Sequence, residues 1–358
     1  MRIKKALFLG TLCTAVSGMS LFAQAGVSYA KSAEKTTEAA SSEEAESEEE
    51  TSEEVTYPIT IEHAFGETVI ESKPERIATI GWENQDTPLA LGVAPVGVSA
   101  ANYGMVTDNN LHPWTDEAFA DLGVEKPVVF DDVDGLDFEQ ISDCNPDVIL
   151  AAYSGMTQED YDTLSQIAPV IPYKEKAWQT SWREQTIENA EGMGMKPEGE
   201  KKVKEVEDLI AEKLEEYPQL EGIPTAFCWI SADDFSTFYV YLPTDPRAAY
   251  LLDLGFTLPE SVQKLAGETD DFNITVSREN ADQLDDIQLM VVYGDEDLLK
   301  SLQEDKLMSQ IPAIKNGAVA LVDSTSALAG ASTPSILSIP YEIDEYLQLL
   351  SDVAENIK

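Results

Sequence analysis

Short apolar runs alternate with segments of helical periodicity from Tyr57 to the end of the chain. Strands are predicted at residues 76–81, 94–98, 127–130, 148–153, 169–173, 226–230, 238–242, 289–293 and 318–323. Helical patterns lie between several of them and close the chain over about 339–357. Strands that alternate with helices predict an α/β protein with mostly parallel sheets.

One helix–strand unit occurs in each half of the chain with the same spacing. Residues 137–153 predict a short acidic-capped helix, a turn and a buried strand that ends in a tyrosine, and residues 277–293 have the same layout. Glu139 and Glu279 each lie fourteen residues before that tyrosine. The repeat predicts two similar Rossmann-like lobes. Because ligands of open α/β sheets bind beyond the carboxyl ends of the strands, a ligand cleft is expected between Tyr153 and Tyr293.

The segment between the two halves predicts a single long helix. Pro197 suits a first helical turn and Pro218 a stop. The apolar residues between them recur at spacings of three and four: Val203, Val206, Ile210, Leu214 and Tyr217. Such a helix would be ~30 Å long and would connect the lobes stiffly. We therefore predict an N-terminal lobe at 57–196, a connecting helix at 197–218 and a C-terminal lobe at 219–358; an ordinary surface helix of one lobe is the alternative.

The first 56 residues have the composition of an export signal and a linker. Residues 1–30 combine a cationic start, an apolar stretch and small-x-small sites that suit cleavage of a signal peptide. An uncleaved membrane anchor is the alternative reading. Residues 31–56 hold ten Glu and two Lys among Ser, Thr and Ala, which predicts a solvated acidic linker. The protein is therefore expected outside the cytoplasm, at the cell surface or in the periplasm.

The globular part is strongly acidic as well. The whole chain has a formal net charge of −44, and residues 57–358 keep 57 of the 67 acidic and 18 of the 23 basic residues, a net charge of −39. This charge argues against nucleic acid and anionic lipid as partners. Few cations of the C-terminal lobe can reach the cleft, so a weakly charged ligand is expected there.

The sequence lacks the common catalytic and metal-binding motifs. There is no GxSxG, Walker, GxGxxG or HExxH motif, and His63 and His112 are the only histidines. No catalytic residue, metal site or cofactor is predicted. Beyond the signal segment, Cys144 and Cys228 either form a disulfide, which an exported protein permits, or are small buried residues of separate lobes, the reading that we favour.

Aromatic residues lie on the loops and strand ends expected at the cleft. The predicted ligand-binding residues are Trp82, Tyr103, Tyr153, Trp229, Tyr239, Arg247 and Tyr293. As a set they favour a pocket for a large, partly aromatic ligand, although each alone is more often a core residue. For Arg247, the alternative to ligand contact is a surface ion pair with Asp245 or Asp253.

The chain resembles the substrate-binding proteins of iron–siderophore and cobalamin ABC importers, whose lobes are joined by one rigid helix. The resemblance covers residues 57–358. The resemblance rests on short apolar motifs, each of low specificity, whose order and spacing match the family. These motifs lie at residues 74–78, 89–98, 138–141, 145–155, 251–256, 277–281 and 311–319. The resemblance implies a monomeric receptor that captures a ferric siderophore, with iron held only inside that ligand, and delivers it to a membrane permease dimer.

The same resemblance implies a role for two further residues and narrows the class of ligand. A surface Glu on each lobe docks onto the permease in the family, and the motifs place those residues at Glu139 and Glu279. The segment Ser181–Thr186 favours the siderophore branch over cobalamin. A cobalamin- or haem-binding receptor of the same class is the alternative. The alternative from a different functional class is a secreted enzyme on the same two-lobed scaffold. The chain departs from relatives of single-membrane bacteria because it lacks a lipid-anchoring Cys before its acidic linker.

Overall fold

The computed structural model describes residues 55–132 and 135–358. The predicted signal peptide at 1–30 lies outside these residues, and so does the predicted linker up to residue 54. Among the helices in the described part of the chain, none has the length and apolar character needed to cross a bilayer.

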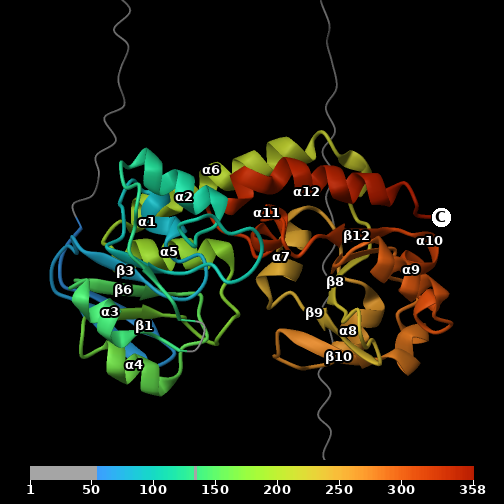
Figure 1. Cartoon of the computed structure of the whole chain (residues 1–358), viewed down its shortest axis with the longest axis horizontal. Helices are drawn as coiled ribbons and strands as arrows, with labels where there is room; N and C mark the ends of the chain where they lie inside the picture. Colours follow the sequence, from blue (N-terminus) through green and yellow to red (C-terminus); the bar gives the residue numbers. More distant parts are fainter. Residues whose placement is uncertain (1–54, 133–134) are drawn as a thin grey trace, which may run out of the picture. The chain divides into compact units, whose positions relative to one another are not determined.

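The N-terminal lobe is built on a five-stranded sheet, of which β3 and β6 are labelled in Figure 1. Every neighbouring pair of its strands is parallel, in the order β5-β4-β3-β6-β7. Its strands are β3 (Ile77–Thr79), β4 (Gly97–Ser99), β5 (Val129–Phe130), β6 (Val148–Ala151) and β7 (Val170–Pro172). Its helices are α1 (Asp86–Ala90), α2 (Pro113–Asp121), α3 (Phe138–Asp143), α4 (Gln158–Leu164) and α5 (Trp182–Gly192).

Both faces of this sheet are covered, which is why its strands read as continuous apolar runs. Along β6, Ile149 packs in one cluster with Leu164 of α4, whereas Leu150 packs on the opposite face. That second face is covered by α5 and by an antiparallel hairpin of β1 (Ile59–His63) and β2 (Gly66–Ile70).

The C-terminal lobe has a mixed five-stranded sheet in the order β10-β9-β8-β11-β12. Strands β8, β11 and β12 are parallel, and β9 is antiparallel to both of its neighbours. The strands are β8 (Thr225–Trp229), β9 (Thr237–Tyr241), β10 (Asn273–Ser277), β11 (Leu289–Tyr293) and β12 (Val319–Val322). The helices are α7 (Pro246–Asp253), α8 (Glu260–Ala266), α9 (Glu296–Glu304), α10 (Pro312–Asn316), α11 (Ala327–Ala331) and α12 (Ser338–Ala354). Three 3₁₀ turns complete the chain: η1 (Pro218–Leu220), η2 (Arg278–Gln283) and η3 (Met308–Gln310). The two sheets together confirm the predicted α/β class with mostly parallel sheets.

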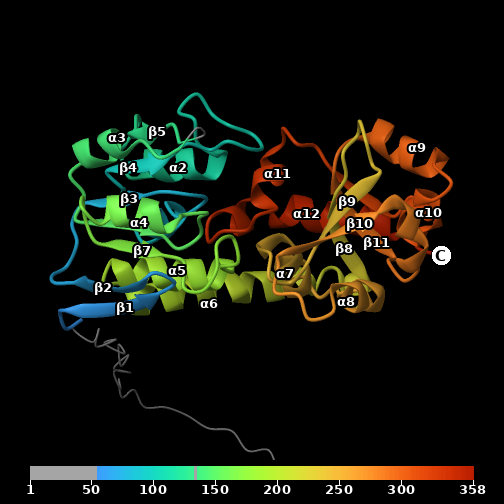
Figure 2. The same ribbon diagram turned by 90° about the horizontal axis from the view of Figure 1, so that it is seen from below.

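Helix α6 (Lys196–Leu214) lies where the apolar stripe predicts a long helix. Its first half packs on α5, and the close contact needs Gly199, because a Cβ there would lie 2.5 Å from that of Ala190. Farther along, Val206 and Ile210 join the core of the C-terminal lobe. Figure 2 shows α6 passing from α5 toward α7 and α8. A helix packed on both lobes restricts their relative movement. The boundaries of the two lobes and the connecting helix stay a prediction.

Several local features differ from the predictions. The segment after Ser277 is the 3₁₀ turn η2 rather than an α-helix like α3, although both elements span six residues. Strand β6 ends at Ala151, two residues before Tyr153. Helix α5 was not predicted, because its buried face carries polar residues and gives no apolar stripe.

Candidate ligand-binding cleft

The two sheets direct their carboxyl strand ends toward the junction of the lobes. Trp82 follows β3 and Tyr153 follows β6 in one lobe, while Tyr293 ends β11 in the other. Tyr103 of the N-terminal lobe packs edge-on against Tyr293, with ring centroids 5.2 Å apart. The structure thus brings predicted ligand residues from both lobes into contact.

The aromatic cluster continues into the C-terminal lobe. The ring of Tyr293 lies 5.2 Å from that of Phe227, which lies 5.8 Å from that of Tyr241. Burial raises the pKa of Tyr103 to about 12. A phenol with such a pKa is neutral at pH 7 and can donate its hydrogen to an anionic oxygen of a ligand.

A second aromatic group forms the N-terminal wall of the cleft and centres on Trp178, which the sequence did not single out. Its ring lies 5.6 Å from that of Trp82 and 5.3 Å from that of Tyr153, which is almost fully buried. Trp178 adopts a left-handed φ of 63°, and its ring lies directly over Gly155. A pocket of about 360 Å³, here called the wall pocket, adjoins these rings. It is lined by Ile80, Gly81, Trp82, Asn102, Asp132, Gly135, Leu136, Ser154, Gly155, Met156, Asp160 and Trp178.

Replacement of Gly155 by Ala is expected to weaken ligand binding about fivefold, which corresponds to the loss of one aromatic contact. A Cβ at this position would lie 2.6 Å from the Trp178 ring and would push the ring out of the wall pocket. Titration of the tryptophan fluorescence with ligand measures the effect. Wild-type affinity in the variant would show that the Trp178 ring does not contact the ligand.

Two further predicted residues, Trp229 and Tyr239, face each other across β8 and β9. They are directly paired in the sheet, their rings lie 5.6 Å apart, and each is 40% exposed. Trp229 is the last residue of β8, and large aromatic side chains that are exposed beside a strand end can cover part of a bulky ligand. Tyr241 lies two residues after Tyr239 and therefore on the same face of β9. This period of two could have identified Tyr241 from the sequence as a further aromatic residue of the cleft.

Arg247 is buried against the aromatic cluster. Its guanidinium lies 4.0 Å from the centroid of the Tyr241 ring, and its Nη2 lies 2.6 Å from Oδ2 of Asp245. The alternative prediction, an ion pair between Arg247 and Asp245, is therefore correct about the partner, but the pair is buried rather than on the surface. Burial lowers the pKa of Arg247, but the hydrogen bonds that its guanidinium donates to Asp245 outweigh burial and raise this pKa above its ordinary value. The pair leaves the cleft no net positive charge from this residue.

Three buried ionisable groups lie beneath the cleft. Asp86 is fully buried and accepts hydrogen bonds from Trp114, Thr115 and Ser335, the last of which belongs to the segment between α11 and α12. Burial and neighbouring Glu83 raise the pKa of Asp86. His112 Nε2 lies 3.1 Å from Glu83 Oε1. Burial lowers the pKa of His112, but the carboxylate of Glu83 outweighs burial and raises it. These groups tie helices α1 and α2 to the C-terminal lobe.

The two predicted docking residues lie away from these pockets. Glu139 is exposed in the first turn of α3, and Glu279 is exposed in η2. The sequence repeat thus places an accessible carboxylate at matching positions of the two lobes.

The cysteines Cys144 and Cys228 are free and buried, as favoured over a disulfide. Within residues 55–132 and 135–358, no group of three His, Cys, Asp or Glu side chains has an arrangement that could hold a metal ion.

Comparisons with known proteins agree with this geometry. A family model described as periplasmic binding protein matches residues 77–325. Petrobactin-binding protein YclQ of Bacillus subtilis is 24% identical over 305 residues, which cover 81% of this chain and 88% of that protein. The probable siderophore-binding lipoprotein YfiY of the same organism is 25% identical over 237 residues, 65% of this chain and 67% of that protein. The crystal structure of PiaA from Streptococcus pneumoniae TIGR4 in complex with ferrichrome is 47% identical, with a TM-score of 0.81, and covers 84% of this chain and 100% of that chain.

Proposed function

The chain belongs to the periplasmic binding protein family, and we propose that it is the substrate-binding protein of an ABC importer that captures a ferric siderophore outside the cytoplasm. The single observation that carries this proposal is the 47% identity to PiaA over the full length of a structure solved with ferrichrome. The petrobactin named for YclQ supports the same class of ligand. A cobalamin or haem receptor of the same class is the weaker reading.

The aromatic lining of the cleft supports a bulky metal complex as ligand. Rings from both lobes meet at the Tyr103–Tyr293 contact, and Trp82 and Trp178 form one wall. Aromatic walls give a large contact area with little loss of side-chain entropy. Neutral phenols and the guanidinium of Arg247 can donate hydrogen bonds to iron-bound oxygens.

The charge of the cleft supports a weakly charged complex. Arg247 is already neutralised by Asp245, and Asp132 and Asp160 line the wall pocket. Burial raises the pKa of Asp132. A multiply anionic complex would enter this site without cationic partners, which is costly. A ferric trihydroxamate, which has no net charge, fits these surroundings.

A titration with chemically defined complexes tests the proposed function. A ferric trihydroxamate of zero net charge is expected to bind at least tenfold more tightly than a ferric tris-catecholate of charge −3, because the catecholate lacks cationic partners. Quenching of tryptophan fluorescence reports binding, and cobalamin and haem serve as comparison ligands. Tighter binding of the catecholate would refute the charge argument, and tighter binding of cobalamin or haem would refute the siderophore assignment.

The remaining parts of the proposal follow from the family. The relatives named above are binding proteins, and we propose a non-catalytic receptor rather than a secreted enzyme. The receptor acts as a monomer, holds no cofactor of its own and delivers its ligand to a permease dimer through Glu139 and Glu279. Its predicted signal segment supports export, and the lipoprotein named among its relatives supports an extracytoplasmic location.

A further inference from the structure

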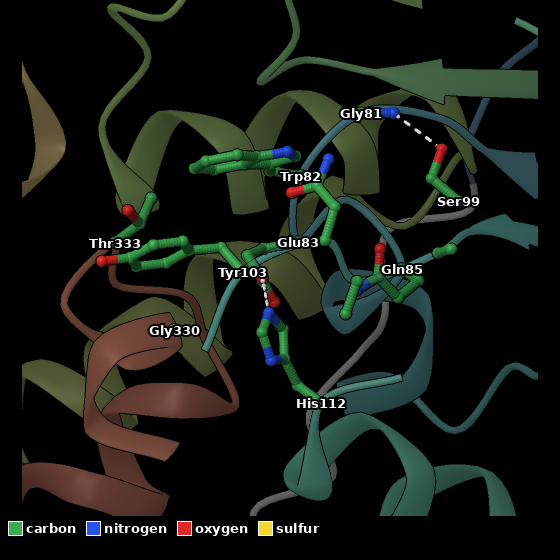
Figure 3. Close-up of a pocket in the computed structure, with 12 residues that line it drawn as sticks. Gly81, Trp82, Glu83, Gln85, Ser99, Tyr103, His112, Gly330 and Thr333 are labelled. Atoms are coloured by element: carbon green, nitrogen blue, oxygen red, sulfur yellow. Dashed lines mark hydrogen bonds and ion pairs between the residues drawn. The ribbon is translucent and has the colours of Figure 1, made fainter. Parts of the chain in front are cut away.

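A second, smaller pocket adjoins the wall pocket on the far side of Trp82. We call it the side pocket; it is lined by Gly81, Trp82, Glu83, Gln85, Ser99, Ala100, Ala101, Asn102, Tyr103, His112, Gly330 and Thr333 (Figure 3). Gly81, Trp82 and Asn102 line both pockets. A flexible arm of a ligand held in the wall pocket can therefore extend past Trp82 into the side pocket.

The side pocket contains a buried carboxylate oxygen without a partner. Glu83 is only 6% exposed, its Oε1 contacts His112, and its Oε2 has no N–H or side-chain hydroxyl donor within the described chain, with the carboxyl of Asp86 as its charged neighbour. Oε1 of Gln85, a residue that is 5% exposed, is equally unpaired. A buried polar atom without a partner is destabilising, and more so when it is charged. Two such acceptors at one pocket indicate an occupant that donates hydrogen bonds.

The backbone holds Glu83 in this position. Its φ of 59° lies in the left-handed region, which a residue with a Cβ rarely adopts, and such strain is concentrated at functional sites. On the opposite side, Gly330 of α11 leaves no room for a side chain, because a Cβ there would lie 2.7 Å from the His112 ring. The pocket has about 20 Å³ of free space, enough for one group the size of a water molecule.

The groups around the side pocket favour a hydrogen-bond donor over an anion. Glu83 contacts His112, burial and Glu83 raise the pKa of Asp86, and Tyr103 is a neutral phenol. The protein around the pocket is strongly acidic. An ammonium group is the size of water, carries three donors and forms charge-assisted hydrogen bonds with a carboxylate. An anionic or purely apolar arm would leave both acceptors unpaired.

We propose that the side pocket binds the terminal ammonium group of a ferric siderophore that carries a primary-amine arm. This inference rests on the proposed function, because the iron-bearing part of the ligand must occupy the main cleft. The receptor then selects, among weakly charged complexes, those with a cationic arm.

Two ligands that differ only at the arm test the proposal. The probes are a linear ferric trihydroxamate that ends in a primary amine and its N-acetylated derivative. Titration calorimetry on the wild-type protein is expected to give at least tenfold tighter binding of the amine, the effect of about one charge-assisted hydrogen bond. Equal affinities would overturn the inference, since the pocket would then hold water only, while the proposed function would stand. Failure of both probes to bind would overturn the proposed function and this inference with it.

Variants of the side-pocket residues test whether the preference for the amine arises in this pocket. Glu83→Gln is expected to bring the two affinities within about twofold of each other, and Gln85→Leu is expected to reduce the preference about threefold, as one weaker acceptor is lost. Gln85→Leu provides an independent test if Glu83→Gln does not fold. Glu342→Gln removes a carboxylate that is 7% exposed and lies outside both pockets, so this control should keep the full preference. A tenfold preference that survives both pocket variants would overturn the assignment to the side pocket.

Discussion

Replacement of Arg247 by Ala is expected to weaken siderophore binding at least tenfold, about 1.4 kcal/mol, and to lower the free energy of unfolding by roughly 3 kcal/mol. The stability loss arises because Asp245, whose side chain is fully buried, would remain without its cationic partner. The binding loss arises because the cleft loses a hydrogen-bond donor beside Tyr241. Titration calorimetry measures the first quantity and denaturant unfolding the second.

Arg183→Ala is the matched control for this variant. Arg183 also lies over an aromatic ring, that of Trp182, and forms ion pairs with Glu207 and Asp253, whereas Arg247 lies over Tyr241 in the aromatic cluster of the cleft. The Arg183 side chain is 31% exposed, so its loss should destabilise the protein less and leave the affinity unchanged. If Arg247→Ala lost stability but bound ligand normally, Arg247 would be a structural residue that only holds Asp245 and Tyr241.

The double variant Glu139→Ala and Glu279→Ala is expected to abolish siderophore uptake by cells while leaving ligand affinity nearly unchanged. Both carboxylates are exposed and lie outside the pockets, so their removal does not alter the cleft. Each contributes at most ~1 kcal/mol to stability through its place in a first helical turn. Uptake of a radiolabelled iron complex and titration of the purified protein separate transport from binding.

A second double variant controls for loss of surface charge. Glu159 and Glu296 are also exposed, lie in the first turns of α4 and α9, and occupy different lobes. Their replacement by Ala should leave uptake intact. Normal uptake by the first double variant, or equal loss in both, would show that Glu139 and Glu279 do not dock specifically onto the permease.

Much of the fold could be predicted because burial on both faces leaves a clear signal in the sequence. The apolar runs of β3, β6, β8 and β11 predicted central strands, and the helix stripe predicted α6. Helix α5 escaped prediction because Gln185 and Asn189 on its buried face bond to Asn84 across 101 and 105 residues. Such polar burial depends on partners that only the folded chain brings near.

For the cleft, the sequence by itself determined which residue types are available, and the tertiary structure decided their roles. The repeat identified Tyr293, which ends β11, and Tyr153, which lies two residues beyond the end of β6, because the approximate ends of strands follow from local pattern. The spacing of Asp245 and Arg247 was enough to predict that they could pair. The burial of this pair under Tyr241 depends on how β9 packs against α7. Trp178 and Glu83 gave no signal, since their positions depend on left-handed backbone conformations that long-range packing stabilises. A hydrophobic pattern records whether a side chain is buried, whereas its partners in space depend on contacts between residues far apart in the chain.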